Sequence, residues 1–327
     1  MLERLREPWS DQRAERTLGA LASFVLLVIV LMIVFVAVRA WPSFQHNGLS
    51  WFTGKGDVDL QIGNQVNTGA KPTSADFQLG AWPLIWGTVL TTGFAVAIGL
   101  AFSVLAAIFI VEFAPGGLRR VVVPVVRLLA AVPSVIYGLI GILVLVPFVN
   151  DHLVSEARKK SVQYVINLSG TGLIVSVVIL TVMITPIMIA IIVDALYAVP
   201  RGWKEGAVAL GVNRWRAMWT VSVRAARPAI IAGAVLACAR ALGEAIMLSM
   251  VSGSKGFAPN PADGLTFIFE PLRPLASTIV EDAESLNAPA VRATVYSFAL
   301  LLLFSAFVLS IGAWLAKQPM KKYGIRV

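Results

Sequence analysis

The amino-acid sequence predicts an all-α membrane protein with six transmembrane helices. The chain of 327 residues is 57% hydrophobic and only 14% charged, with a mean hydropathy of +0.80, which lies outside the range of ordinary soluble domains. Six segments are apolar over the roughly 20 residues that a helix needs to cross a bilayer. Lysine and arginine also gather in the segments on one side of these spans, as they do on the cytoplasmic side of membrane proteins.

The first span is an apolar run over 20–38, within a helix expected over 20–40, and a charged lead-in over 1–19 precedes it. The run is too long for the apolar part of a secretory signal peptide, and no small-residue cleavage motif follows it, so an uncleaved anchor is expected. The other five spans form a core over 82–316. They cover 82–111, 121–149, 172–196, 229–251 and 293–316.

Prolines predict breaks within two of these spans, because proline removes a backbone hydrogen bond from a helix. The third span contains Pro124, Pro133 and Pro147, and the fourth contains Pro186. We expect the third helix to break at Pro133 and the fourth to break at Pro186.

The distribution of basic residues predicts that both termini lie in the cytoplasm. The segments on the terminal side hold 17 lysines and arginines, whereas those on the opposite side hold eight, including the local exception 158–160. Loops 41–81 and 252–292 are then outside. Loop 197–228 and the tail 317–327 are inside, and Glu112 and Asp194 near the inner ends of their spans are expected to interact at the membrane interface.

Several classes of site have no support in the sequence. Cys238 is the single cysteine, and His46 and His152 lie far apart, so neither a disulfide framework nor a metal centre is expected. The net charge of +9 is explained by cytoplasmic loops beside membrane lipid, and nucleic-acid binding is not expected. The phosphate-binding pattern G-x-x-x-x-G-K-[ST] and the common hydrolase patterns are absent. We therefore expect neither enzymatic activity nor a bound cofactor.

The inner loop contains a basic segment, KEGAVALGVNRWRAMWTVSVRAARP, over 204–228. Pro200 suits the first turn of a helix, Gly211 suits its left-handed end, and Asn213 can cap a second helix. Trp215, Met218 and Trp219 share one face of that second helix, with arginines around it. Such a helix suits either lipid headgroups or a docked soluble protein.

The spacing within this segment resembles the EAA loop of ABC importer permeases. Glu205-Gly206-Ala207 is followed after three residues by Gly211, and nine residues later by Val221-x-Val223. Gly206, Val221 and Val223 are mild departures from the family pattern, whereas Arg224 replaces a proline. The resemblance implies a type I importer (MetI-like) fold and two coupling helices that dock an ATP-binding subunit. The docking residues would be Glu205, Ala207, Gly211, Trp215 and Arg216.

Three further stretches resemble phosphate permeases of the PstC/PstA type, with PstC favoured by the N-terminal extension and by the stretch RALGE. They are AVPSVIYG over 131–138, RALGEA over 240–245, and GAWP over 80–83 followed by Gly87-Thr88. The resemblance implies a subunit of a phosphate importer in the bacterial inner membrane. Its partners would be a PstA-like second permease, a PstB-like ATP-binding dimer that holds ATP and Mg, and a PstS-like external phosphate-binding protein.

The residues of these stretches suggest a substrate path. Arg240 and Glu244 lie within the fifth span at a spacing of four, where they can pair on one helix face; charges at that depth are expensive and usually functional. Arginine suits an oxyanion, although a pair that only fixes helix packing is the alternative. Pro133, Ser134 and Tyr137 mark either an ordinary kink or an unwound segment that lines the path. Tyr137 could donate a hydrogen bond there.

Two other functions remain open at this stage. The chain could be a permease for another oxyanion, such as sulfate or molybdate, although the phosphate-permease stretches argue against it. It could also be a non-transporting membrane sensor or scaffold, which would have no ATP-binding partner.

Overall fold

The computed structural model describes residues 11–67, 72–164 and 166–321. The first ten residues of the predicted lead-in and the last six of the predicted tail lie outside the described residues. The helical elements are α1 (Asp11–Asn47), α2 (Ser50–Thr53), α3 (Val58–Val66), η2 (Ser74–Phe77), α4 (Trp82–Ile108), η3 (Phe109–Phe113), α5 (Gly116–Ala130), α6 (Ser134–Ile140), η4 (Gly141–Leu145), α7 (Val146–Phe148), η5 (Val149–Leu153), α8 (Glu156–Val162), α9 (Leu173–Ala198), α10 (Arg201–Ala209), α11 (Arg214–Ala217), η6 (Met218–Ser222), α12 (Val223–Leu242), α13 (Ile246–Val251), η7 (Pro261–Phe269), α14 (Leu275–Glu281), η8 (Ala283–Ser285) and α15 (Pro289–Lys321).

The prediction of an all-helical membrane protein with six spans is confirmed. Within the described ranges, six helical segments are long and apolar enough to cross a membrane, and they are Ala14–Asn47, Ser74–Phe113, Ser134–Leu153, Leu173–Ala198, Arg214–Leu242 and Pro289–Leu315. The cytoplasmic location of both termini stays a prediction. We use it here only to call the end of the bundle with loops 41–81 and 252–292 the outer end, and the opposite end the inner end.

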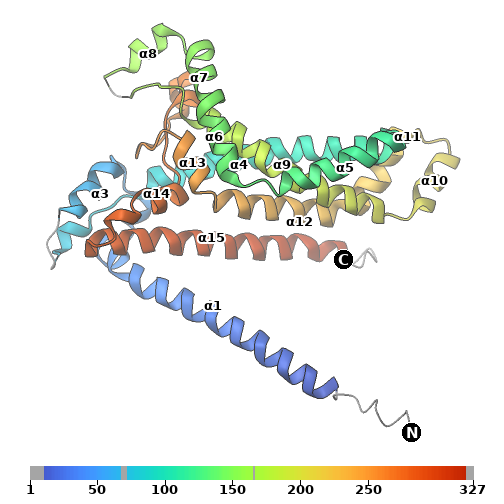
Figure 1. The fold of residues 1–327 in the computed structure, drawn as a ribbon, viewed down its shortest axis with the longest axis horizontal. Coiled ribbons are helices and arrows are strands. Elements are labelled where there is room, and N and C mark those ends of the chain that lie inside the picture. Colours follow the sequence, from blue (N-terminus) through green and yellow to red (C-terminus); the bar gives the residue numbers. More distant parts are fainter. Residues whose placement is uncertain (1–10, 68–71, 165, 322–327) are drawn as a thin grey trace.

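Helix α9 lies at the centre of the bundle, packed against α4 on one side and α12 on another. Half of its apolar window is buried inside the protein, whereas no part of the apolar window of α1 is buried. Helix α9 is apolar around its whole circumference, which suits a central position. Helix α1 meets α15 near the outer end and diverges from it toward the N-terminus (Figure 1). The apolar surface of α1 is therefore left for lipid or for another membrane subunit.

The third span breaks where the sequence predicts. Helix α5 ends at Ala130 and α6 begins at Ser134, with Pro133 in an extended conformation between them. The predicted break at Pro186 is wrong, because α9 continues through this residue. Pro186 is buried in the core, and α4 and α12 pack along α9. These neighbours hold the helical path, as they often do at prolines in transmembrane helices.

The fifth span also breaks, although the sequence predicts one helix over 229–251. Elements α11, η6 and α12 run as one helical segment from Arg214 to Leu242, and α13 begins only at Ile246. The intervening backbone over 243–245 leaves the helix at Gly243, a residue that is unfavourable inside helices. Both broken spans therefore contain a short non-helical segment at one of the stretches that resemble phosphate permeases.

A buried arginine joins the two outer loops. Arg273 Nη1 donates to Asp59 Oδ1 at 2.9 Å, and Nη2 lies 3.0 Å from Asp282 Oδ1. Its Nε lies 2.8 Å from Glu281 Oε2, without the alignment of a hydrogen bond. Burial raises the pKa of the Glu281 and Asp282 carboxyls, and Arg273 opposes the rise. One guanidinium thus holds three carboxylates from segments more than 200 residues apart in sequence.

Candidate functional site

The two interrupted spans meet through their outer halves. Helix α6 packs on α13, and Gly138 makes the close approach possible. A Cβ atom at Gly138 would lie 2.8 Å from Met250 Sδ and 3.2 Å from the backbone Cα of Met247. The glycine that ends the stretch AVPSVIYG is thus required by contact with the helix that follows RALGEA.

Tyr137 stabilises the break in the third span. In a continuous helix the carbonyl of Leu129 would accept a hydrogen bond from the residue at position 133, but Pro133 has no N–H. The Tyr137 hydroxyl instead donates to the Leu129 carbonyl at 3.0 Å, and the Val132 amide donates to the same oxygen at 3.3 Å. Tyr137 is buried. Its single proton is therefore donated to the backbone at the break, and a place for Tyr137 in the substrate path stays a prediction.

The predicted pair between Arg240 and Glu244 is not formed. The structure gives no ion pair between them, because the helix ends at Leu242 and the spacing of four no longer places both side chains on one face. Glu244 is buried and its Oε1 accepts a hydrogen bond from the Met247 amide at 3.3 Å, in the first turn of α13. The carboxylate caps that short helix from the interrupted segment.

Arg240 is left exposed on the surface of the chain. It lies near enough to Tyr137 for its charge to act on the phenol, and within the described residues no carboxylate lies within ion-pair distance of its guanidinium. The helix rises about 18 Å between Pro228 and Arg240, at 1.5 Å per residue, which is more than half of a hydrocarbon core of about 30 Å. A charge at this depth faces water or protein rather than lipid. Ser134 is half-buried at the start of α6.

The inner loop forms two short helices, as its sequence predicts. Gly211 has φ +83° between them, a left-handed conformation that favours glycine. The Asn213 side chain accepts a hydrogen bond from the Arg216 amide at 2.8 Å and so caps α11. Pro200 lies one position earlier than expected, immediately before α10. Helices α10 and α11 project at the inner end of the bundle (Figure 1).

Most of the residues predicted to dock a partner are exposed on the surface of this loop. Glu205, Trp215 and Arg216 are exposed, and Ala207 is half-buried. Met218, predicted on the same face as Trp215, is instead buried in the core. Arg224 is exposed and lies in the first turn of α12, where it keeps the N–H that a proline would remove.

Two ion pairs at the inner end join segments that lie far apart in the sequence. Lys204 Nζ lies 2.5 Å from Glu112 Oε2, and the Glu112 side chain is only 5% exposed. Arg127 pairs with Asp194 at 2.8 Å, with both side chains more than half exposed. The sequence shows Glu112 as a carboxylate at the end of an apolar span, but it does not indicate Lys204 as the partner, because the two residues are 92 positions apart.

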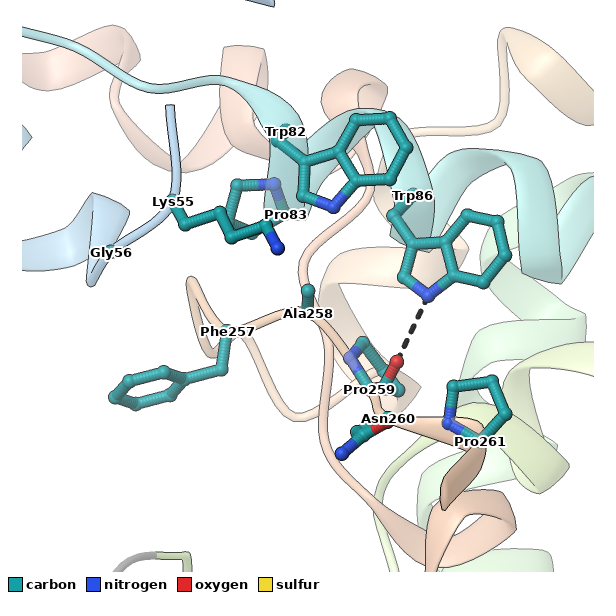
Figure 2. A pocket seen from close by; sticks show the side chains of 10 residues that line it. All are labelled: Lys55, Gly56, Trp82, Pro83, Trp86, Phe257, Ala258, Pro259, Asn260 and Pro261. Atoms are coloured by element: carbon teal, nitrogen blue, oxygen red, sulfur yellow. Dashed lines mark hydrogen bonds between the residues drawn. The ribbon is translucent and has the colours of Figure 1, made fainter. Parts of the chain in front are cut away.

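The outer end carries a cavity of about 420 Å³ between the two outer loops and the start of α4. Figure 2 shows the Trp82 and Trp86 side chains on one side of it and the 257–261 loop on the other, with the Trp86 indole donating to the Pro259 carbonyl at 2.9 Å. Lys55 lies at its edge. None of the five predicted path residues lines this cavity.

Comparison with known proteins identifies the family. The family model described as "Binding-protein-dependent transport system inner membrane component" matches residues 99–318, which include both interrupted spans and the inner loop. The chain belongs to this family. It is thus a permease component of a binding-protein-dependent ABC importer and a multi-pass protein of the bacterial inner membrane.

Relatives of this permease cover most of its length. The "Probable ABC transporter permease protein YqgH" of Bacillus subtilis is 34% identical over 76% of this chain and 74% of its own. "Phosphate transport system permease protein PstC 1" of Mycobacterium tuberculosis is 32% identical over 87% of this chain and 86% of its own. "Probable phosphate transport system permease protein PstC" of Methanocaldococcus jannaschii is 33% identical over 72% and 74%.

Two solved structures share the fold of the permease. A bacterial alginate ABC transporter in complex with an alginate-bound periplasmic protein gives a TM-score of 0.59 at 13% identity, over 97% of this chain and 99% of the other. An inward-facing MetNI methionine ABC transporter gives 0.50 at 18% identity, over 73% and 96%. The predicted MetI-like architecture is confirmed.

Proposed function

We propose that this permease forms half of the translocation path of an ATP-driven inorganic phosphate importer. The observation that carries the proposal is Arg240, which is exposed, lies at membrane depth and has no carboxylate partner among the described residues. A guanidinium in such a place suits an oxyanion, because it stays charged and offers a planar fork of donors. The names of the two PstC relatives support phosphate as that oxyanion.

The remaining path residues act around this arginine. Pro133 interrupts the third span, and the Tyr137 hydroxyl holds the interruption through the Leu129 carbonyl. Ser134 offers a hydroxyl at the start of α6. Glu244 accepts from the Met247 amide at the start of α13, and α12 ends just after Arg240, at Leu242. The interruption of the fifth span thereby frees the side chain of Arg240 from the i,i+4 partner that a continuous helix would give it.

The inner loop would dock an ATP-binding dimer through Glu205, Ala207, Gly211, Trp215 and Arg216. ATP and Mg would be held by that dimer, and this chain would supply no nucleotide site. A second permease would cover part of the apolar surface of α1, and an external phosphate-binding protein would deliver the cargo. The exposed carboxylate and indole of α10 and α11, and the left-handed bend at Gly211, support a docking role for the loop.

Uptake of radiolabelled phosphate into vesicles that hold the assembled complex tests the proposal. We expect ATP-dependent uptake that excess phosphate competes away and excess sulfate or molybdate does not. Arg240→Gln is expected to leave assembly intact and to reduce uptake at least about tenfold, since one lost charged contact of about 1.4 kcal/mol or more gives that factor. Arg127→Gln, at an exposed ion pair elsewhere, is the matched control.

Three results would count against the proposal. Normal uptake by the Arg240→Gln complex would remove this residue from the path. Competition by sulfate or molybdate as strong as that by phosphate would assign a different oxyanion. Purification of the chain without any ATP-binding subunit would favour a scaffold that does not transport.

A further inference from the structure

We propose that movement of the inner loop is transmitted to the inner end of the second span, at Glu112 and Phe113, by the contacts of Lys204 and Trp215. This inference rests on the proposed docking of an ATP-binding subunit and adds the route by which docking moves the bundle. The loop is continuous in sequence with the fourth and fifth spans only. Its noncovalent contacts therefore decide whether the second span moves with it.

The first contact comes from α10. Lys204 makes the one side-chain ion pair or hydrogen bond that the structure gives α10, among its described side chains, and this contact goes to Glu112. The Glu112 side chain is 5% exposed and that of Lys204 is 32% exposed. A buried carboxylate that loses its ion-pair partner is strongly unfavourable. Glu112 therefore favours conformations in which α10 stays within reach.

The second contact comes from α11 and falls on the next residue. The Trp215 ring lies 6.2 Å from the Phe113 ring and 5.7 Å from the Trp219 ring, measured between centroids. Both coupling helices thus contact adjacent residues of the same turn, one through charge and the other through an aromatic ring. Neither helix makes a comparable side-chain bond to another span in the described part of the chain.

The turn that receives these contacts has a separate support. Residues Phe109–Phe113 form the π-helical turn η3, and such turns are frequent at functional sites. The Arg119 guanidinium donates to the carbonyls of Ile110, Val111 and Ala114 at 3.0, 2.8 and 3.2 Å, and it stacks on Tyr197 of α9. The turn is therefore a firm attachment point rather than a frayed helix end.

The surroundings leave room for the ion pair to shift. A cavity of about 230 Å³ lies beside it, lined by Glu112, Lys204, Arg119 and residues of α9 and η6. A flexible lysine can follow a small displacement of α10 into this space without losing the carboxylate. A larger displacement would pull the second span, which packs against α9.

Site-directed labels on the second and fifth spans test the proposal in the assembled complex. A cysteine label replaces Leu105 on α4 or Leu236 on α12, both about half exposed, in a background with Cys238→Ala. We expect ATP to change both label signals in the wild type. Lys204→Met should reduce the change at 105 and keep the change at 236, because the fifth span remains covalently joined to α11. Lys204→Arg should restore the change at 105.

Transport gives the second readout. Lys204→Met and Glu112→Gln should each lower phosphate taken up per ATP hydrolysed by about 2- to 30-fold, the range typical of residues that couple distant sites. Arg127→Met, which removes the exposed ion pair at the same end of the bundle, is the control and should leave both readouts unchanged.

The proposal is overturned if the label at 105 responds to ATP in Lys204→Met and Glu112→Gln as it does in the wild type. It is also overturned if both labels lose their response, because Lys204 would then serve docking rather than transmission. A wild-type complex that takes up no phosphate would refute the proposed cargo alone, since the label readout does not depend on the cargo.

Discussion

The buried arginine that joins the two outer loops gives the sharpest prediction about stability. Arg273→Met keeps much of the apolar volume of the side chain and removes the charge between Asp59, Glu281 and Asp282. Removing one partner of a buried ion pair costs about 3–5 kcal/mol, because the remaining charge is left uncompensated. Arg273 is 6% exposed and its partners come from two outer loops, so the full range applies.

Thermal unfolding of the purified permease in detergent measures this effect. A chain of this length loses about 2 °C in Tm per kcal/mol, so Arg273→Met should lower Tm by about 6–10 °C. Arg292→Met is the matched control, because Arg292 lies in the same outer region and makes no ion pair among the described residues. A loss in Arg273→Met no larger than in Arg292→Met would refute the reasoning. Hydrogen exchange should also rise over 57–66 and 275–282, where the partners lie.

Two further predictions concern the same cluster and the inner loop. Burial raises the pKa of Asp282 in the folded chain above its value in the unfolded chain, so the folded chain binds this proton more tightly. The permease should therefore lose stability as pH rises from about 4, the ordinary carboxyl value, through the folded pKa. Asp282→Asn should therefore give a smaller change in Tm between about pH 4 and about pH 8 than the wild type does. The pKa of Glu281 is also raised, so part of the change remains in both proteins. Equal slopes would contradict this reasoning. Glu205→Lys should lower ATP-coupled uptake at least about tenfold or release the ATP-binding subunit, since a like-charge contact at an interface costs several kcal/mol. Glu284→Lys, in the outer loop, is the control. An unchanged coupled rate in Glu205→Lys would count against the docking role.

Much of the fold follows from patterns within single segments. Length and apolar composition predict the six spans, because a helix in lipid must satisfy its own backbone and cover itself with apolar side chains. Gly211 and Asn213 predict the bend and the cap of the inner loop, because a left-handed residue and a side-chain acceptor act within one helical turn. Pro133 predicts the break in the third span for the same reason: the missing N–H is a property of the residue.

The same local reasoning is wrong where neighbouring helices intervene. Pro186 does not break α9, because α4 and α12 hold the helix on both sides. Arg240 and Glu244 have the spacing of a helical pair, but α12 stops at Leu242 and Glu244 accepts from the Met247 amide instead. A helical spacing predicts a contact only while the helix continues, and here the helix ends between the two residues.

Contacts between distant segments lie beyond any local pattern. Lys204 and Glu112 are 92 residues apart, and Arg273 and Asp59 are 214 apart. Each partner is recognisable as a charge beside an apolar span, yet the sequence contains several candidates of either sign for each. Composition and short motifs thus establish the class of this permease, its spans and its family. Packing of the helices selects which charges meet, because burial makes an unpaired charge expensive and only the folded arrangement brings one particular partner within reach.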